Sequence, residues 1–384
     1  MILPVSLTID TPGVGSWAVE DVTLVGATIT HGSDDLWQAP DPSTASFTML
    51  DPAGEWRPRL GFTTRVTLEV DGRTRFVGTI TDLRATWDGE WVLDVIAVGL
   101  KVASRTRLVD PRPLETAAAR IAGVWAEVGM TVHAVDAAGS VTLLPVTGYE
   151  TASDITNAAA SADLGYITQR RDGSMWYRGR DTIAASQLVR AVLPAGGVFP
   201  SSAWVKSIGD LATRVVCGYG TAEPQEIVMV SDEGLELDLG RWQEKAHSSL
   251  YSTRADALAM AEEVLERMHA PSWRTESLDL DLALPAYDAT RTRNVLDLEV
   301  GDVVWVTGAP ASTPAGVEET YVVLGWDETL DGTAHGIALR VVEYALLRES
   351  ARWGNVAMSW QTAGDTAVGA YRFSPPTLEP GVAA

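Results

Sequence analysis

The feature that most constrains the fold of this chain is a series of short apolar–polar alternations separated by Asp-Gly pairs. Residues 64–70 alternate before Asp71-Gly72, and a second run follows over 75–81. A longer run ends at Asp88-Gly89 and returns through residues 91–98. Asp-Gly favours the turn in which both central residues have positive φ, so each pair of runs predicts a β-hairpin. Hairpins repeated in this way predict a sandwich or a barrel.

The middle of the chain has a different pattern. Apolar residues at helical spacing over 114–128 stop at Gly129, which suits the end of a helix. Thr151-Ala152-Ser153-Asp154 has the spacing of a capping box and predicts a second helix. A further hairpin is expected about Asp172-Gly173. The sequence therefore predicts an α+β segment over residues 109–197.

Strand patterns return after this segment, interrupted by one helix that begins at Thr253-Arg254-Ala255-Asp256. Cys217 lies in an apolar run, where we expect a small buried residue, and as the single cysteine it cannot form an intramolecular disulfide. The chain is thus predicted to be mainly β with an α+β insertion. Its predicted domains are a β domain over 1–108, the insertion over 109–197, a second β domain over 198–348, and an extended arm over 349–384.

The charge of the chain limits its partners. Of its 384 residues, 51 are acidic and 29 are basic, which leaves a formal net charge of −22. Proteins whose main task is to bind nucleic acid draw affinity from basic patches, and this sequence has no run of Lys or Arg. The charge argues against tight binding of DNA or RNA, but it would suit a wall past which DNA slides without sticking.

The sequence shows no motif of catalysis or cofactor binding. A G-x-G-x-x-A match over 13–18 precedes a predicted strand and not the helix that a dinucleotide site needs. The adjacent acids Asp34-Asp35 and Glu262-Glu263 diverge on any regular element and indicate solvated surface. The histidines are far apart in sequence: His31, His133, His247, His269 and His335. We expect no catalytic residue, metal or cofactor, although a zinc site or an acid pair assembled from distant segments stays open.

Three segments alternate apolar residues with acids, at 235–239, 278–282 and 296–300. As strands, each would bury one face and show carboxylates on the other. These carboxylates belong to Glu236, Asp238, Asp279, Asp281, Asp297 and Glu299. They are interpreted as ordinary amphipathic strands, as the lining of an acidic lumen, or as ligands of calcium.

Tryptophan is frequent, with 14 in the chain. Four of them lie in segments of weak strand character: Trp37, Trp56, Trp353 and Trp360. Aromatic side chains in loops are candidate interface anchors, and the alternative is a local core beneath long loops.

We expect neither export by a signal peptide nor insertion into a membrane. The first residues, Met1-Ile2-Leu3-Pro4-Val5, lack the basic and long apolar regions of a signal peptide. No stretch approaches the ~20 apolar residues of a membrane span.

The order of segments over residues 1–348 resembles that of the tail hub proteins, or minor tail proteins, of long-tailed phages, especially phages of actinobacteria. The resemblance lies in the strands at 75–82 and 91–99, the two helices and hairpin of the insertion, and the strand at 212–217 before the Thr253 helix. Its most typical piece is Leu296-Asp297-Leu298-Glu299-Val300-Gly301-Asp302-Val303-Val304-Trp305-Val306.

This resemblance implies two tail-tube-like β-barrel domains around a small α+β domain, with no catalytic residue. It further implies a homotrimer at the tail tip, joined to a distal tail protein ring and to tip or fibre proteins. DNA would pass through its lumen without specific binding, and the protein, made in the host cytoplasm, would reside in the virion tail. Two alternatives stay open, a receptor- or carbohydrate-binding tail-tip protein and a cell-wall hydrolase.

Overall fold

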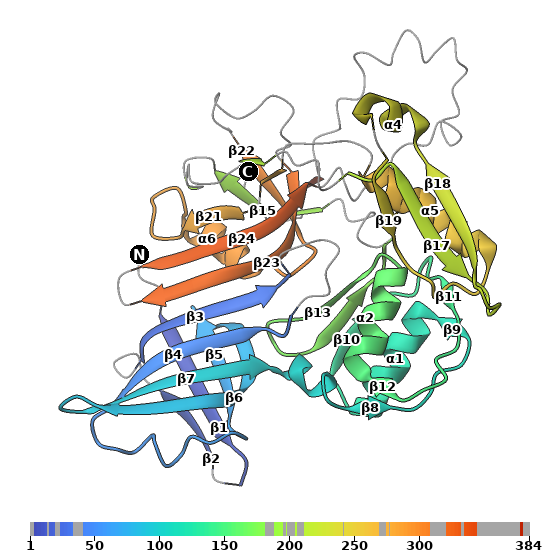
Figure 1. Cartoon of the computed structure of the whole chain (residues 1–384). Coiled ribbons are helices and arrows are strands. Elements are labelled where there is room, and N and C mark those ends of the chain that lie inside the picture. Colours follow the sequence, from blue (N-terminus) through green and yellow to red (C-terminus); the bar gives the residue numbers. More distant parts are fainter. Residues whose placement is uncertain are drawn as a thin grey trace.

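The structure is a computed structural model that describes residues 4–13, 15–19, 24–33, 41–180, 188–194, 197, 204–205, 211–240, 242–268, 274–275, 277–307, 320–331, 334–343 and 377–378 (Figure 1). Of the described residues, 48% lie in strands and 21% in helices, which confirms the prediction of a mainly β fold. Two lobes, each with its own core, are joined through the β13–β14 hairpin of the second.

The first lobe is built on one large sheet that takes strands from both ends of the chain. Its N-terminal strands are β1 (Val5–Thr11), β2 (Gly15–Val19), β3 (Leu24–Gly32), β4 (Thr44–Asp51), β5 (Arg65–Val70), β6 (Arg73–Trp87) and β7 (Trp91–Gly99). Its later strands are β15 (Leu188–Pro194), β21 (Ser277–Asp281), β22 (Val303–Thr307), β23 (Thr320–Asp331), β24 (His335–Glu343) and β25 (Thr377–Leu378).

The strand order of this sheet is β2-β1-β5-β6-β7-β4-β3-β23-β22-β15-β25, with β24 and then β21 branching from β23. The two predicted β domains are therefore not separate barrels, because β3 pairs antiparallel with β23 from Gly32↔Gly325 to Gly26↔Asp331. Among the described residues no sheet closes into a barrel. A single core, which includes Ile29, Phe47 and Trp326, runs beneath both halves.

The second lobe packs helices on small sheets. Its helices are α1 (Ala117–Val128), α2 (Ala152–Ala162), α4 (Glu233–Leu239) and α5 (Arg254–Met268). Its strands are β8 (Leu108–Val109), β9 (Glu115–Thr116), β10 (Val132–Val135), β11 (Thr142–Leu143), β12 (Glu150–Thr151), β13 (Tyr166–Gln169), β14 (Met175–Arg178), β17 (Arg214–Tyr219), β18 (Glu226–Ser231) and β19 (Glu244–Ala246). Four further short elements lie among the described residues: η1 (Leu100–Ser104), β16 (Trp204–Val205), β20 (Arg274–Thr275) and α6 (Ala289–Leu296).

The core of the second lobe does not follow the predicted domain boundary at residue 197. Trp125 of α1 and Tyr177 of β14 share one core with Cys217 of β17 and Ala261 of α5. The reason is that α5 packs on β17 and β18, so this later segment completes the α+β lobe instead of extending the large sheet.

The local signals of the sequence are confirmed where turns and caps were predicted. Asp71 and Gly72 have φ of 50° and 69°, as the hairpin between β5 and β6 requires. Thr151 accepts a hydrogen bond from Asp154 N at 3.1 Å and begins α2. The same contact, from Asp256 N to Thr253 at 3.1 Å, lies at the start of α5.

Two of the three leucine–acid segments are not strands, and this prediction was wrong. Residues 235–239 lie in α4, because Asp232 caps the helix by accepting from Leu235 N at 2.9 Å and Gly240 ends it. Residues 296–300 are the end of α6 and the loop after it. The third segment is strand β21, with Leu278 and Leu280 buried as predicted.

Strands β1 and β2 form a hairpin, and the G-x-G-x-x-A match begins at Gly13, which follows β1, and continues through Gly15 to Ala18 of β2. No dinucleotide site has that arrangement. Among the described residues, no helix combines the length and the apolar character that crossing a bilayer requires.

The seam between β3 and β23 generates the first testable prediction. Gly32 has φ of +89°, and a Cβ there would lie 2.2 Å from the carbonyl oxygen of Leu324. Gly32→Ala should lower the free energy of unfolding by about 2–4 kcal/mol, since a backbone clash adds to the strain. Gly54→Ala, at φ of +69° with nothing within 4 Å, is the control. It should cost about 1 kcal/mol. Equal shifts in urea denaturation would contradict this account of the seam.

Candidate functional site

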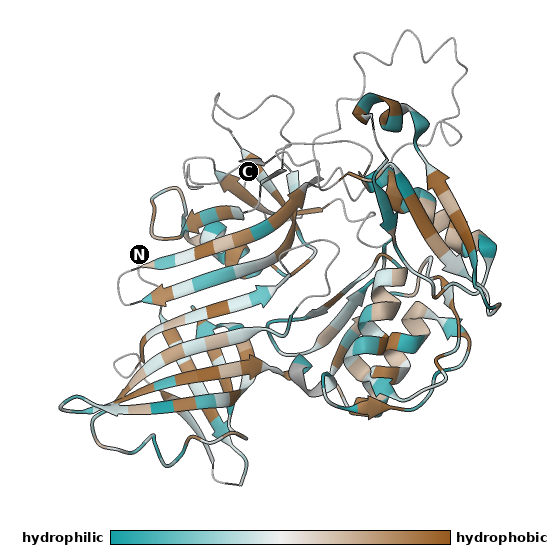
Figure 2. Ribbon diagram, in the orientation of Figure 1, coloured by the Kyte–Doolittle hydropathy of each residue, from teal (hydrophilic) through white to brown (hydrophobic). Residues whose placement is uncertain are grey.

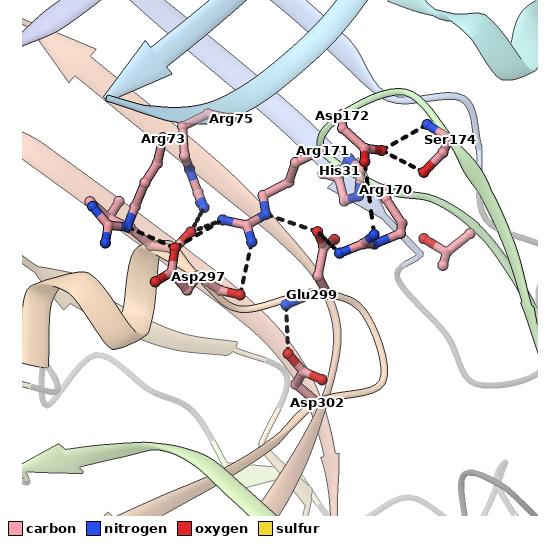
Figure 3. A network of polar contacts seen from close by, with 12 residues as sticks. His31, Arg73, Arg75, Arg170, Arg171, Asp172, Ser174, Asp297, Glu299 and Asp302 are labelled. Atoms are coloured by element: carbon pink, nitrogen blue, oxygen red, sulfur yellow. Dashed lines mark hydrogen bonds and ion pairs between the residues drawn. The ribbon is translucent and has the colours of Figure 1, made fainter. Parts of the chain in front are cut away.

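Arginines converge on the loop between α6 and β22, which we call the junction loop (residues 296–302). Arg73 and Arg75 reach it from β6 of the first lobe, and Arg171 reaches it from the β13–β14 hairpin of the second (Figure 3). Arg178 of β14 also donates to the Val300 carbonyl of this loop. The loop is thus the place where the two lobes are joined by charge.

Arg75 is the most deeply buried of these cations, with 1% of its surface exposed. Its Nε donates to Glu328 Oε2 at 2.8 Å, and its NH1 donates to the Leu296 carbonyl. The second oxygen of Glu328 lies 2.8 Å from His335 Nε2. Burial alone would raise the pKa of Glu328, but Arg75 and His335 together hold it below its ordinary value. The core of the sheet therefore contains a charged and paired carboxylate.

Arg171 satisfies the end of helix α6. Its NH1 and NH2 donate to the carbonyl oxygens of Leu296 and Asp297, the second at 2.9 Å. Carbonyls at a helix end lack intrahelical partners, and a cation there also suits the helix dipole. Nε of Arg171 donates to Glu299 Oε1 at 3.0 Å. One side chain of the hairpin therefore fixes both the backbone and the acid of the junction loop.

Two acids of the junction loop, Glu299 and Asp302, pack against these arginines. Burial raises the pKa of Glu299 above its ordinary value, and the cations Arg171 and Arg170 oppose this shift. Burial also raises the pKa of Asp302, which accepts from Glu299 N at 2.9 Å and lies 3.8 Å from Arg178. Both carboxyls depend on their hydrogen bonds and cations to be tolerated in this position.

Gly301 keeps the loop close to the hairpin. It has φ of +89°, and a Cβ at this position would lie 2.3 Å from NH1 of Arg178. That same NH1 donates to the Val300 carbonyl at 3.2 Å. The glycine of the Gly301-Asp302 pair, in the segment 296–306, is therefore explained by a close contact between the lobes.

His31 lies beside this network on β3. Its ring stacks on Trp326 with centroids 4.4 Å apart, and its Nδ1 is 2.6 Å from Ser43 Oγ. Burial lowers its pKa from 6.5 to about 3, and the positive charges of Arg75, Arg171 and Arg340 add to the effect. The imidazole is therefore neutral in the folded protein near pH 7.

The structure does not gather the six acids predicted from the leucine–acid pattern. Asp297 and Glu299 belong to the junction, where Glu299 is buried and Asp297 accepts from Arg73 Nε at 2.7 Å. Asp279 and Asp281 share the polar face of β21. Glu236 pairs with Arg214, while Asp238 is exposed on α4.

These six acids do not come together as a shared metal site. In the part of the chain that the structure describes, no three His, Cys, Asp or Glu side chains lie close enough to hold one ion. Glu299 also departs from the predicted row of exposed carboxylates, because its loop turns it toward Arg171. Whether the remaining acids face a lumen stays a prediction.

Of the four tryptophans predicted as interface anchors, Trp56 is the one that lies within the described residues. It is half-buried against the first core, and Arg59 lies over both Trp56 and Trp17, 5.1 Å from each ring centroid. Trp37, Trp353 and Trp360 lie outside the described residues, as does the predicted arm apart from 377–378.

The sequence analysis did not predict a pair of tryptophans in the first lobe. Trp87, at the end of β6, is 59% exposed and meets Trp91 of β7 edge to face at 5.3 Å. Arg57 lies over the Trp91 ring at 4.3 Å from its centroid. The Asp88-Gly89 turn between the two tryptophans is a signal that could have placed them side by side.

Comparison with solved structures shows a shared fold. The 43 kDa tail protein of prophage MuSo2 from Shewanella oneidensis matches with a TM-score of 0.62 and 12% identity, over 89% of this chain and 99% of that chain. The tail protein from Neisseria meningitidis MC58 matches with a TM-score of 0.61 and 12% identity, over 92% and 98%.

A third similar structure is the E. coli c3393 protein, described as a component of the type VI secretion system that is similar to the T4 bacteriophage tail proteins gp27 and gp5. It matches with a TM-score of 0.50 and 11% identity, over 90% of this chain and 78% of that chain. No protein-family model and no curated protein matches the sequence. The chain therefore has the fold of phage tail proteins.

The junction predicts a large and specific loss of stability for Arg171→Ala. The substitution leaves Glu299 as a buried, poorly paired acid and removes the donors to two carbonyls. It should therefore lower the free energy of unfolding by about 3–5 kcal/mol. Arg73→Ala is the control, because its pair with the half-exposed Asp297 should contribute less than about 1 kcal/mol. Urea denaturation followed by circular dichroism measures both, and similar losses would refute the assigned role of the junction.

Burial of His31 predicts acid sensitivity. The imidazole takes up a proton with pKa 6.5 when unfolded but only at about 3 when folded, so stability is lost as pH falls from 6.5 toward 3. By pH 5 this should amount to about 2 kcal/mol. His31→Gln should flatten the difference between urea midpoints at pH 7 and pH 5. The exposed His133→Gln is the control, and a profile unchanged by His31→Gln would exclude this cause.

Proposed function

We propose that this chain is a structural protein of a phage-type tail and acts as the hub that joins the tail tube to tip or fibre proteins. The observation that carries the proposal is the extent of the fold match, which spans 89% of this chain and 99% of a prophage tail protein. A match of this extent concerns the architecture of the whole protein and not a shared module. The hub role in particular is supported by the likeness to a secretion-system component described as similar to gp27 and gp5.

The open sheet of the first lobe favours assembly with further copies. Beyond Thr79 the strand β6 leaves β5, so its outer edge over 81–87 has no partner strand among the described residues. Unpaired strand edges are satisfied when copies close into a ring. We propose a ring of three copies, placed between a distal tail protein ring and the tip.

The charge of the chain fits passage of DNA. A net charge of −22 would keep phosphates from binding to the wall of a channel. Asp279 and Asp281, which share the polar face of β21, are the acids that we propose for the lumen, with Asp297 as a further candidate. We assign no catalytic step, because the buried acids and arginines of the junction bind one another, within the large sheet as Arg75 and Glu328 and between the lobes as Arg171 and Glu299.

A second candidate function is receptor or carbohydrate binding at the tail tip. The exposed Trp87, its neighbour Trp91 and the adjacent Arg57 favour it, because aromatic rings stack on sugars and arginine suits anionic groups. A cell-wall pull-down compares the chain with Trp87→Ala. Retention of wild-type chain and loss of the variant would favour this second function.

The hub proposal predicts the symmetry of the purified protein. Sedimentation velocity should give a species of three copies. Larger species should not appear as the protein concentration increases. Negative-stain images should show a ring with threefold symmetry. A chain that stays monomeric at every concentration, with compact single particles, would overturn the proposal.

A further inference from the structure

The β17–β18–β19 sheet of the second lobe has one covered face and one bare face. Helix α5 covers the face that carries Val215, Cys217 and Val228. The opposite face of β18 carries Ile227 and Met229, which are 65% and 55% exposed. Figure 2 shows β18 as a mainly apolar strand at the margin of the lobe.

Further apolar side chains extend this bare surface toward α4. Trp242 is 64% exposed and lies against Arg214 of β17, whose guanidinium is 5.0 Å from the ring centroid. Leu237 of α4 is 82% exposed. We call Ile227, Met229 and Trp242 the bare patch. Large apolar side chains that gather on the surface of a soluble protein mark sites of interaction.

Strand β18 is also a free edge. It pairs with β17 on one side, and no described residue pairs with the other. Its six residues include no proline or lysine, its one charge is Glu226 at the first position, and its register is continuous, without a bulge. Because natural edges are normally blunted by proline, lysine or a bulge, a mainly apolar edge without these devices indicates a strand that is covered in use.

The acidic residues around the bare patch favour a basic partner. Residues 223–245 carry two basic residues, Arg241 and Lys245, against seven acidic ones: Glu223, Glu226, Asp232, Glu233, Glu236, Asp238 and Glu244. Among the described residues, Arg214 lies against Trp242 of the patch and is paired with Glu236. A second copy of a chain with net charge −22 would be repelled, whereas a basic partner would be attracted.

We infer that the bare patch and the β18 edge bind an extended segment of a different protein, in which apolar and basic residues alternate. The segment adds a strand to β18, its apolar side chains lie on Ile227 and Met229, and its basic side chains meet the surrounding acids. This deepens the proposed function, on which it rests for the context of a tail, by naming a surface for a partner other than the chain itself.

The test uses the full chain and fluorescent peptides of about six residues, the length of β18. A peptide of alternating valine and lysine should bind at least about tenfold more tightly than peptides of valine and glutamate or of serine and lysine. N-methylation of its pairing edge should abolish binding. Fluorescence anisotropy at fixed salt measures each affinity. Equal binding of the serine–lysine or N-methylated peptide would overturn the inference.

The protein variant is Ile227→Thr with Met229→Thr, which keeps strand propensity and adds no charge. It should weaken the valine–lysine peptide by about tenfold or more. The matched control is Leu108→Thr with Leu114→Thr, at residues 61% and 58% exposed, which should bind as wild type. Circular dichroism verifies that both fold. Unchanged affinity of the Ile227/Met229 variant would overturn the inference.

Sedimentation of the same variants separates this inference from the proposed function. The Ile227/Met229 variant should form the same three-copy species as wild type, because the bare patch takes a different protein. Loss of that species in the variant would make the patch a self-contact and overturn the inference. Failure of the wild-type chain to form it would sink the hub proposal and leave the peptide result standing.

Discussion

A guanidinium buried away from water must be given acceptors, and this requirement fixes how the two lobes meet. Arg75 and Arg171 come from different lobes, yet both donate to the carbonyl of Leu296. The junction loop can satisfy both only where β6, β23 and the β13–β14 hairpin come together. Removing either cation leaves buried acids or carbonyls unpaired, so the relative placement of the lobes depends on charge as much as on apolar contact.

The unpaired strand edges and the exposed apolar side chains lie at the periphery of the molecule, around that junction. The open edge of β6, the tryptophan pair at its tip and the bare patch on β18 are distant from the junction loop in the fold (Figure 1). A central charged junction with unpaired strand edges at the margins supports the function that we propose, a protein that joins others. What is shared with the prophage tail proteins is the fold.

Local signals in the sequence predicted much of the secondary structure, because their physics is local. Asp71-Gly72 and Thr151 act through their own neighbours, and both behave as expected. The alternation at 235–239 failed because the cap at Asp232 and the glycine at 240 favour a helix over a strand of period two. The junction could not be predicted, since Arg75 and Glu328 are separated by 253 residues and no short pattern links them. The continuous sheet escaped prediction for the same reason.

The seam between β3 and β23 has a consequence for synthesis on the ribosome. About 290 residues separate Gly32 from its partner Gly325, so at ~10 residues per second the nascent β3 waits on the order of half a minute for its neighbour. During that interval its edge is open to other nascent chains and to chaperones. Slow translation or crowded polysomes should therefore lower the yield of soluble protein, and added chaperones should raise it.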